Sequence, residues 1–124
     1  MRILPVFYLA PPQHFTGAVL TAEIASDENT RTHQVIFSPG ARTNWHKHSE
    51  GQVIKVTIGK AWLAVVEGDR IIKKELKAGE SYEFQPNQKH WHGATPDGLM
   101  EHLATPKGIT VWMEPVDDND YMSK

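Results

Sequence analysis

The sequence predicts an all-β protein, a sandwich or a barrel made of many short strands. Apolar and polar residues alternate over short segments, which is typical of strands with one buried face. Glycine, proline and asparagine separate these segments at regular intervals, and no segment shows a long helical period. With 124 residues, the chain is expected to form a single domain, residues 1–124, around one hydrophobic core.

The N-terminal segment, residues 1–13, is expected to form a strand or an arm. It is mostly apolar and ends in Ala-Pro-Pro, which stops any regular element. A signal peptide would need a more basic start and an uninterrupted apolar run, whereas Pro5 interrupts this one. An apolar strand at a sheet edge needs a partner. We therefore expect a homodimer that forms through this segment.

Turn signals delimit the strands that follow. The expected strands span residues 15–24, 31–37, 46–48, 52–58, 60–67, 70–76, 81–86, 90–94, 99–105 and 109–113. The polar stretch SDENTR and the tripeptide Ser-Pro-Gly separate the first three, and Gly68-Asp69 is typical of a two-residue hairpin turn. Ala-Gly-Glu and Pro86 punctuate the second half. The polar tail, residues 114–124, is expected to fray or to form one helical turn.

Composition excludes several kinds of site and partner. The net charge is −2, so we expect no nucleic acid and no anionic membrane as partner. No apolar run is long enough to cross a membrane, and we expect a cytoplasmic protein. The chain has no cysteine. Disulfides and thiolate zinc sites are therefore excluded, and any metal must bind through nitrogen and oxygen atoms.

Histidines at strand spacing point to a metal site. His46 and His48 are two residues apart, so their imidazoles point to the same face of a strand. His90 and His92 repeat this spacing, and Met100, His102 and Ala104 also share one face. The face that Gln52 shares with Ile54, Val56 and Ile58 is expected to be interior. We predict that these histidines meet inside a barrel.

Each of these residues also has a plainer interpretation. His46 and His48 could form a polar stripe on an exposed strand, and His92 and His102 could simply be packed. Glu50 is a second candidate ligand, but Ser49–Gly51 is expected to be a turn, which places Glu50 at the barrel mouth. His14 and His33 have no partner in the pattern and are expected to be structural or exposed. The four tryptophans are expected to pack in the core or at a subunit interface.

The spacing Gly-x5-His-x-His-x3-Gln-x6-Gly, from Gly40 to Gly59, resembles the first motif of the cupin family, which usually has Glu at the position of Gln52. GESYEFQPNQKHWH resembles the second motif and matches it at Gly79, Pro86 and His90. Asn87 stands where the family usually has Gly, and Asn tolerates the left-handed backbone better than most residues.

The resemblance implies a single cupin barrel, that is, a double-stranded β-helix or jelly-roll. It also implies the metal ligands His46, His48, Gln52 and His90. Nearly the whole chain is similar to a small single-domain subgroup that includes the bacterial cupin hydroxynitrile lyases. In these lyases, the positions of His92 and His102 hold histidines that face the metal without binding it, which implies a catalytic role for both.

The expected activity follows from this resemblance. We expect a metal-dependent lyase that acts on a hydroxyl-bearing small molecule, with Mn or Fe in the cell and with Ni, Co or Zn able to replace it on purification. A Gln ligand leaves a divalent ion its full charge, which strengthens it as a Lewis acid. A cupin dioxygenase, a sugar-acid isomerase and a non-catalytic ligand-binding cupin are the alternatives.

Overall fold

The computed structural model describes residues 5–26 and 30–124. The first four residues of the expected N-terminal arm, and residues 27–29 of the expected loop SDENTR, lie outside the described residues. In the described part of the chain, no helix is long and apolar enough to span a membrane.

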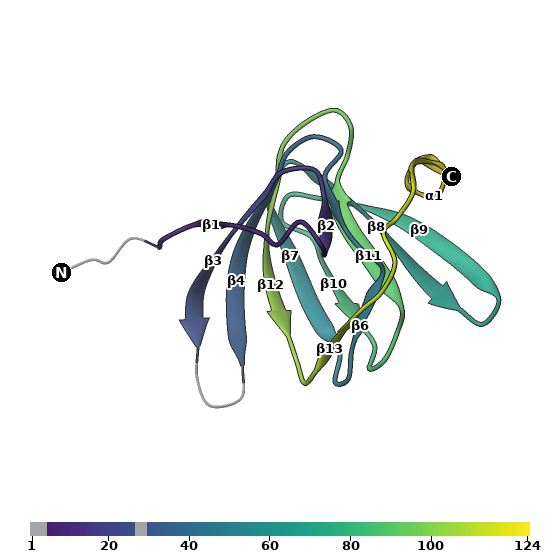
Figure 1. Ribbon diagram of the computed structural model, residues 1–124, viewed down its shortest axis with the longest axis horizontal. Coiled ribbons are helices and arrows are strands. Elements are labelled where there is room, and N and C mark those ends of the chain that lie inside the picture. Colours follow the sequence, from purple (N-terminus) through teal and green to yellow (C-terminus); the bar gives the residue numbers. More distant parts are fainter. Residues whose placement is uncertain (1–4, 27–29) are drawn as a thin grey trace.

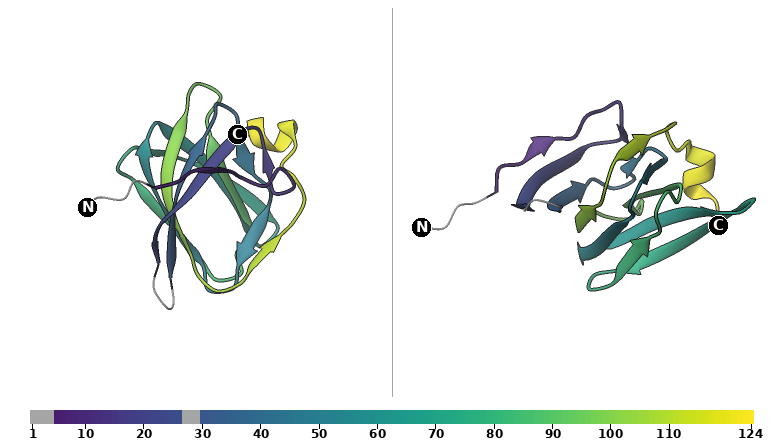
Figure 2. Two further views of the ribbon diagram at one scale, coloured as in Figure 1. Left: turned by 60° about the vertical axis from the view of Figure 1, so that its left-hand side comes forward. Right: turned by 90° about the horizontal axis from the view of Figure 1, so that it is seen from below.

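Two curled antiparallel sheets form the structure (Figures 1 and 2). In spatial order, the first sheet contains β1 (Tyr8–Leu9), β3 (Val19–Ser26), β4 (Arg31–Phe37), β12 (Met100–Pro106), β7 (Gln52–Ile58) and β10 (Ser81–Phe84). The prediction of an all-β jelly-roll is confirmed.

The second sheet carries most of the histidines. Its path runs through β13 (Thr110–Trp112), β6 (His46–His48), β11 (His90–Ala94), β5 (Arg42–Thr43) and β2 (Phe15–Thr16), while β8 (Lys60–Glu67) pairs with β11 and with β9 (Arg70–Lys77). Glu67 pairs with Arg70, so Gly68-Asp69 is the two-residue hairpin turn that the sequence predicts.

The main core lies between the two sheets. Phe37, Ile54, Leu63, Phe84 and Met100 are among its fully buried side chains. Burial of one such side chain contributes about 1.5–3 kcal/mol. Because β4, β7 and β12 are neighbours in the first sheet, their inward faces meet in this core and also form one wall of the cavity described below.

The expected strand over residues 15–24 is wrong as one element, because the chain turns a corner at Gly17. Phe15–Thr16 belongs to the second sheet and Val19–Ser26 to the first. Gly17 has φ +83°, and a Cβ atom there would lie 2.8 Å from the Cβ of Ala41. Only glycine adopts this conformation without strain in so little space. Alternation alone did not reveal this corner.

The interior face expected on β7 ends one residue early. Gln52, Ile54 and Val56 are buried as predicted, but Ile58 is 51% exposed. The pairing of β12 with β7 shifts register between Glu101 and His102, which breaks the regular alternation opposite the end of β7. The prediction that Ile58 faces the interior is therefore wrong.

The C-terminal tail packs on the outer face of the second sheet. Its one helical turn, α1 (Asp118–Met122), is capped by Asp117, whose side chain accepts a hydrogen bond from the backbone N–H of Asp120. Tyr121 from this turn and Val116 form a second buried cluster with Trp45, Ala64 and Trp91. Trp45 and Trp91 therefore pack in a buried cluster, in agreement with the core packing expected for the tryptophans.

Candidate metal centre

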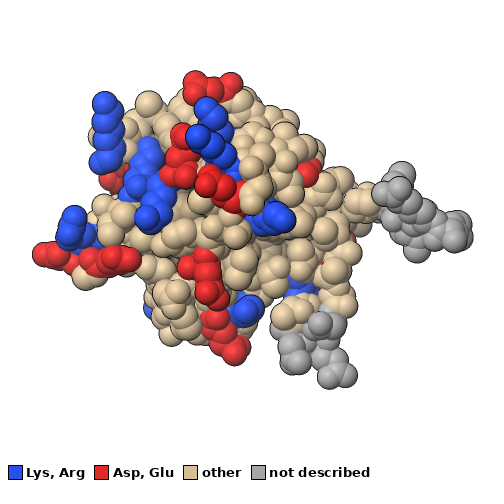
Figure 3. Space-filling model, turned by 180° about the vertical axis from the view of Figure 1, so that it is seen from behind, with Lys and Arg blue, Asp and Glu red and all other residues tan. Residues whose placement is uncertain are grey.

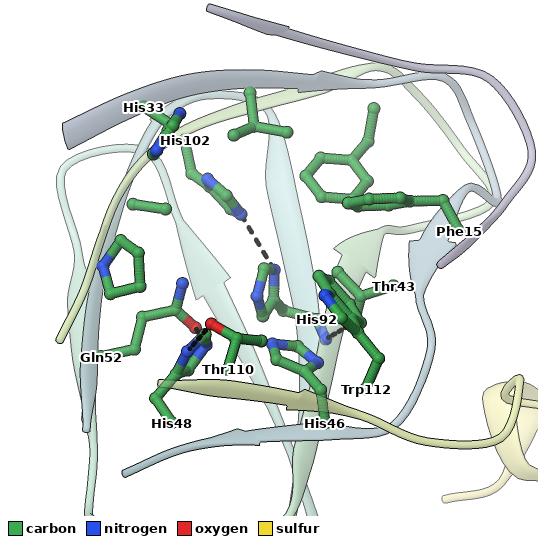
Figure 4. A pocket seen from close by; sticks show the side chains of 14 residues that line it. Phe15, His33, Thr43, His46, His48, Gln52, His92, His102, Thr110 and Trp112 are labelled. Carbon is green, nitrogen blue, oxygen red and sulfur yellow. Dashed lines mark hydrogen bonds between the residues drawn. The ribbon is translucent and has the colours of Figure 1, made fainter. Parts of the chain in front are cut away.

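A cavity of about 230 Å³ opens between the two sheets (Figure 4). Its apolar walls are formed by six residues: Phe15, Val35, Phe37, Ala104, Pro106 and Trp112. Its polar lining consists of His33, Thr43, His46, His48, Gln52, His92, His102 and Thr110. Among these described lining residues there is no Lys, Arg, Asp or Glu, so histidines and uncharged groups determine the chemistry of the cavity.

Strand pairing brings the two histidine pairs together. β6 and β11 are antiparallel neighbours, and His46 pairs directly with His90 although 44 positions separate them. The ring centroids of His46 and His90 are 4.2 Å apart, and those of His46 and His48 are 4.9 Å apart. All three side chains are almost completely buried.

Gln52 brings an amide oxygen next to the ring nitrogens of these histidines. It begins β7, on the opposite sheet, and its Oε1 lies 3.0 Å from His48 Nε2 and 3.1 Å from His90 Nε2. The structure thus brings together all four residues expected as ligands: His46, His48, Gln52 and His90. Glu50 is exposed and does not line the cavity.

The outer nitrogens of the three histidines are held by hydrogen bonds. The Nδ1 atoms of His46 and His90 donate to the backbone carbonyls of Asn44 and Gln88, both at 2.9 Å. His48 Nδ1 lies 2.8 Å from Thr110 Oγ1. A hydrogen on Nδ1 leaves the lone pair of a neutral imidazole on Nε2, which is the tautomer that binds a metal.

These residues fit a divalent transition metal. The Nε2 lone pair of His90 faces Gln52 Oε1, which is also an acceptor, and two acceptors at 3.1 Å repel each other unless a cation lies between them. Three imidazole nitrogens and one amide oxygen are a donor set that suits Mn, Fe, Co, Ni or Zn. The Nδ1 contacts that hold metal-binding histidines in orientation are already present at His46, His48 and His90.

His92 also approaches this point. One ring nitrogen from each of His46, His90 and His92 lies within 4.8 Å of the others, a grouping that could itself hold a metal ion. The Nδ1 of His92 is 3.0 Å from His102 Nε2, whereas His92 Nε2 is buried and has no hydrogen-bond partner among the described residues. His92 therefore presents an unpartnered nitrogen beside the expected ligands, and His102, from β12 of the first sheet, contacts the opposite nitrogen of its ring.

Burial keeps these imidazoles neutral. Desolvation lowers the pKa of His90 to about 3, and it lowers the pKa values of His48 and His102 to about 4. Desolvation, together with neighbouring imidazoles, also lowers the pKa values of His46 and His92 well below 6.5. All five rings are therefore neutral at pH 7, so protons do not compete with a metal for Nε2.

This burial predicts that the metal-free protein loses stability in acid. His90 and His102 stay unprotonated in the folded chain down to about pH 3 and 4, whereas in the unfolded chain they bind protons below about pH 6.5. The contribution of these two histidines to the free energy of unfolding is complete above pH 6.5. It is lost as the pH falls toward 4, by about 1.4 kcal/mol per group and pH unit. Denaturant unfolding of chelator-treated protein at pH 7, 6, 5 and 4.5 measures this slope. A His102→Gln variant should show a shallower slope, and a flat profile would contradict the prediction.

Two residues of the cavity differ from their expected roles. His33 lines the cavity, although it was expected to be structural or exposed, because its strand carries no second histidine to mark an inward face. Trp112 also lines the cavity, with its ring 4.7 Å from that of His46 and stacked on His14 at 4.4 Å. The inward alternation of His33, Val35 and Phe37 along β4 was a signal that could have revealed the first of these roles.

The fold and the site together define a jelly-roll protein whose buried histidine cluster can hold a metal ion at one end of a largely apolar cavity. Residues 33–105 match the family model described as Cupin domain. The chain belongs to the cupin family.

Similar proteins extend this finding. The chain is 38% identical over 125 residues to an (R)-mandelonitrile lyase from Granulicella tundricola, and the match covers 98% of this chain and 82% of the relative. A cupin-like protein from Thermotoga maritima superposes with a TM-score of 0.84 at 34% identity, over 94% of both chains. An oxalate decarboxylase from Lactobacillus farciminis, solved as a formate complex, shares the fold: its TM-score is 0.68 at 16% identity, over 91% of this chain and 37% of that one.

Proposed function

We propose that this chain is a metal-dependent lyase that cleaves a small hydroxynitrile into a carbonyl compound and cyanide. The observation that carries the proposal is the free Nε2 of His92, which lies beside the expected ligands while Nδ1 contacts His102 at 3.0 Å. A base in this position can take a proton from a hydroxyl group held at the metal end of the cavity. The 38% identity to a mandelonitrile lyase supports the same reaction.

The cavity favours a small, neutral substrate with an apolar group. Its volume of about 230 Å³ exceeds the roughly 150 Å³ of an apolar cavity that accommodates benzene, which leaves room for a few more atoms. The described lining residues carry no Lys or Arg to bind a carboxylate, which disfavours a sugar acid. Phe15, Phe37 and Trp112 provide aromatic surface for a ring.

The expected ligands and His92 have separate roles in the cleavage. A bound divalent ion, which we infer to be Mn or Fe held by His46, His48, Gln52 and His90, supplies Lewis acidity that lowers the pKa of a hydroxyl group. His92 Nε2 accepts the hydroxyl proton, and the electron pair of the O–H bond becomes the second C–O bond. The C–C bond breaks, and its pair leaves with cyanide. The His92 imidazolium then returns the proton, which gives hydrogen cyanide.

His102 acts through His92 in this scheme, as a positioning residue. His102 Nδ1 has no hydrogen-bond partner among the described residues. In this scheme Nδ1 carries the hydrogen of the neutral ring, which leaves the lone pair on Nε2. His92 Nδ1–H then donates to His102 Nε2, so that the lone pair of His92 remains on Nε2, where the substrate hydroxyl is expected.

The first experiment measures metal content and activity in parallel. Untagged protein is analysed by elemental mass spectrometry and then assayed for mandelonitrile cleavage and for oxygen uptake. About one Mn or Fe per chain together with cleavage supports the lyase, whereas oxygen uptake with bound iron would favour a dioxygenase. Tight binding of ligands without turnover would favour a non-catalytic cupin. A chain that binds no metal even after reconstitution would contradict every metal-dependent function, that is, both the lyase and the dioxygenase.

We also infer that a second copy of the chain covers β1. This strand lies at the end of the first sheet, and its residues Tyr8 and Leu9 are 67% and 68% exposed. Leu20 and Ile24 on the adjacent β3 are also exposed, and Leu9 pairs with Leu20. An exposed apolar edge of this kind is a ready template for pairing with another strand. The surface seen in Figure 3, in contrast, carries interspersed charges of both signs.

Leu9→Lys is therefore expected to shift the protein from dimer to monomer in sedimentation equilibrium. A lysine at this position should weaken the association of the two copies, because its charge loses hydration when the interface buries it. Ile71→Lys is the matched control, since Ile71 is 59% exposed on β9, at the opposite end of the molecule in Figure 1. A monomeric mass for the unmodified chain at micromolar concentration would contradict the inference.

A further inference from the structure

We propose that His33 is a specificity-determining residue of this cavity, which binds the polar substituent that departs from the hydroxyl-bearing carbon. For a hydroxynitrile, this substituent is the nitrile group. The proposal rests on the proposed function for the reaction, but the placement of His33 can be tested by binding alone.

Strand alternation directs His33 into the cavity. His33, Val35 and Phe37 alternate along β4 and all line the cavity. Phe37 and Val35 are buried, whereas His33 is only half-buried, so the strand runs from the mouth at His33 to the closed end at Phe37. His33 pairs with Ala104 on β12, two residues beyond His102. In Figure 4, His33 and His102 lie across the cavity from His46 and His48.

The imidazole of His33 is available for a ligand. In the described parts of the chain, its side chain makes no hydrogen bond, ion pair or ring contact. The other histidines are engaged: three have Nδ1 partners, His92 and His102 contact each other, and His14 stacks on Trp112. Glu23, the cross-strand neighbour of His33, forms an ion pair with Arg31 instead. A neutral imidazole offers one donor and one acceptor.

The cavity therefore has three chemically different walls. Three of the expected metal ligands, His46, His48 and Gln52, form the wall for a hydroxyl group together with His92. Phe15 and Trp112 form the wall for an apolar ring. His33 supplies a hydrogen-bond donor on a third wall. A carbon that bears a hydroxyl, a ring and a nitrile can place each group on its matching wall in only one handedness. His33 would donate its N–H to the nitrile nitrogen. This hydrogen bond would become stronger as negative charge develops on the departing cyanide.

Replacement of His33 should lower both the rate and the enantiomer preference. For His33→Ala, we expect kcat/KM for the preferred mandelonitrile enantiomer to fall about 10- to 100-fold, the loss of one hydrogen bond to a charged group. The ratio of kcat/KM between the two enantiomers should fall as well, with metal content unchanged. His33→Asn keeps a donor and should recover part of the preference. Gln34→Ala is the control, because Gln34 bonds to Glu101 at 2.8 Å and does not line the cavity.

Binding of a non-reacting probe separates this proposal from the proposed function. Phenylacetonitrile carries a ring and a nitrile but no hydroxyl group, and ethylbenzene carries neither polar group. We expect His33→Ala to weaken phenylacetonitrile binding about tenfold by NMR titration and to leave ethylbenzene binding unchanged. Equal phenylacetonitrile affinity in the variant and the parent would overturn the role of His33, even if the parent cleaves hydroxynitriles. If His33→Ala weakens phenylacetonitrile binding but the parent shows no lyase activity, the role of His33 stands and the proposed reaction is rejected.

Discussion

His102→Gln is expected to reduce hydroxynitrile cleavage by about 100-fold while the metal stays bound. Without the ring of His102, nothing holds the hydrogen of His92 on Nδ1, and a fraction of His92 turns its protonated nitrogen toward the substrate. Loss of a positioned general base typically costs 10²–10⁴-fold, and loss of the group that orients it should fall at the lower end of this range. The measurements are single-turnover rates, metal content and the pH–rate profile.

Several readouts distinguish this positioning role from simple packing. His102 is fully buried beside Phe37, with ring centroids 5.1 Å apart, so His102→Ala also creates a cavity and should lower the melting temperature. His102→Gln keeps most of the volume and serves as the matched variant. A changed pH–rate profile at near-parental stability supports the role. Unchanged turnover in both variants would reject it.

His46→Gln is expected to remove the metal and, with it, all detectable cleavage. His46 belongs both to the expected ligand set and to the group of three ring nitrogens that lie within 4.8 Å. Changes to residues that merely support a ligand cost 10–100-fold in metal affinity, so loss of a ligand should exceed 100-fold. Elemental analysis after dialysis, together with competition by a chelator of known affinity, measures the change.

Gln52→Glu is the informative companion of this variant. The added carboxylate brings a negative charge to a point 3.0 Å from His48 Nε2, which should tighten metal binding. It also cancels one unit of the charge on the ion and weakens its Lewis acidity. Retained metal with reduced cleavage is therefore expected. If His46→Gln retained a full equivalent of metal, the four-residue ligand set would be wrong, and His92 would become the stronger candidate.

Local chemistry in the sequence determined most of the fold. Alternation marked the strands, Gly68-Asp69 marked a hairpin, and the tail could be read as one helical turn. Asn87, which stands where similar motifs carry glycine, adopts φ +60°, as its side-chain chemistry predicts. These features depend on residues close together in the chain. The sequence could therefore predict them without knowledge of how distant strands pair.

Only the tertiary structure decided which faces of the strands meet. Spacing shows that His46 and His48 share a face, but the pairing of His46 with His90 and the approach of Gln52 from the other sheet depend on closure of the barrel. For the same reason, the sequence did not reveal the corner at Gly17 or the exposure of Ile58. The alternation along β4 could place His33 on the face of Val35 and Phe37, but closure of the barrel decided that this face lines the cavity. A period of two residues assigns side chains to two faces, whereas strand register and sheet curvature determine what each face contacts.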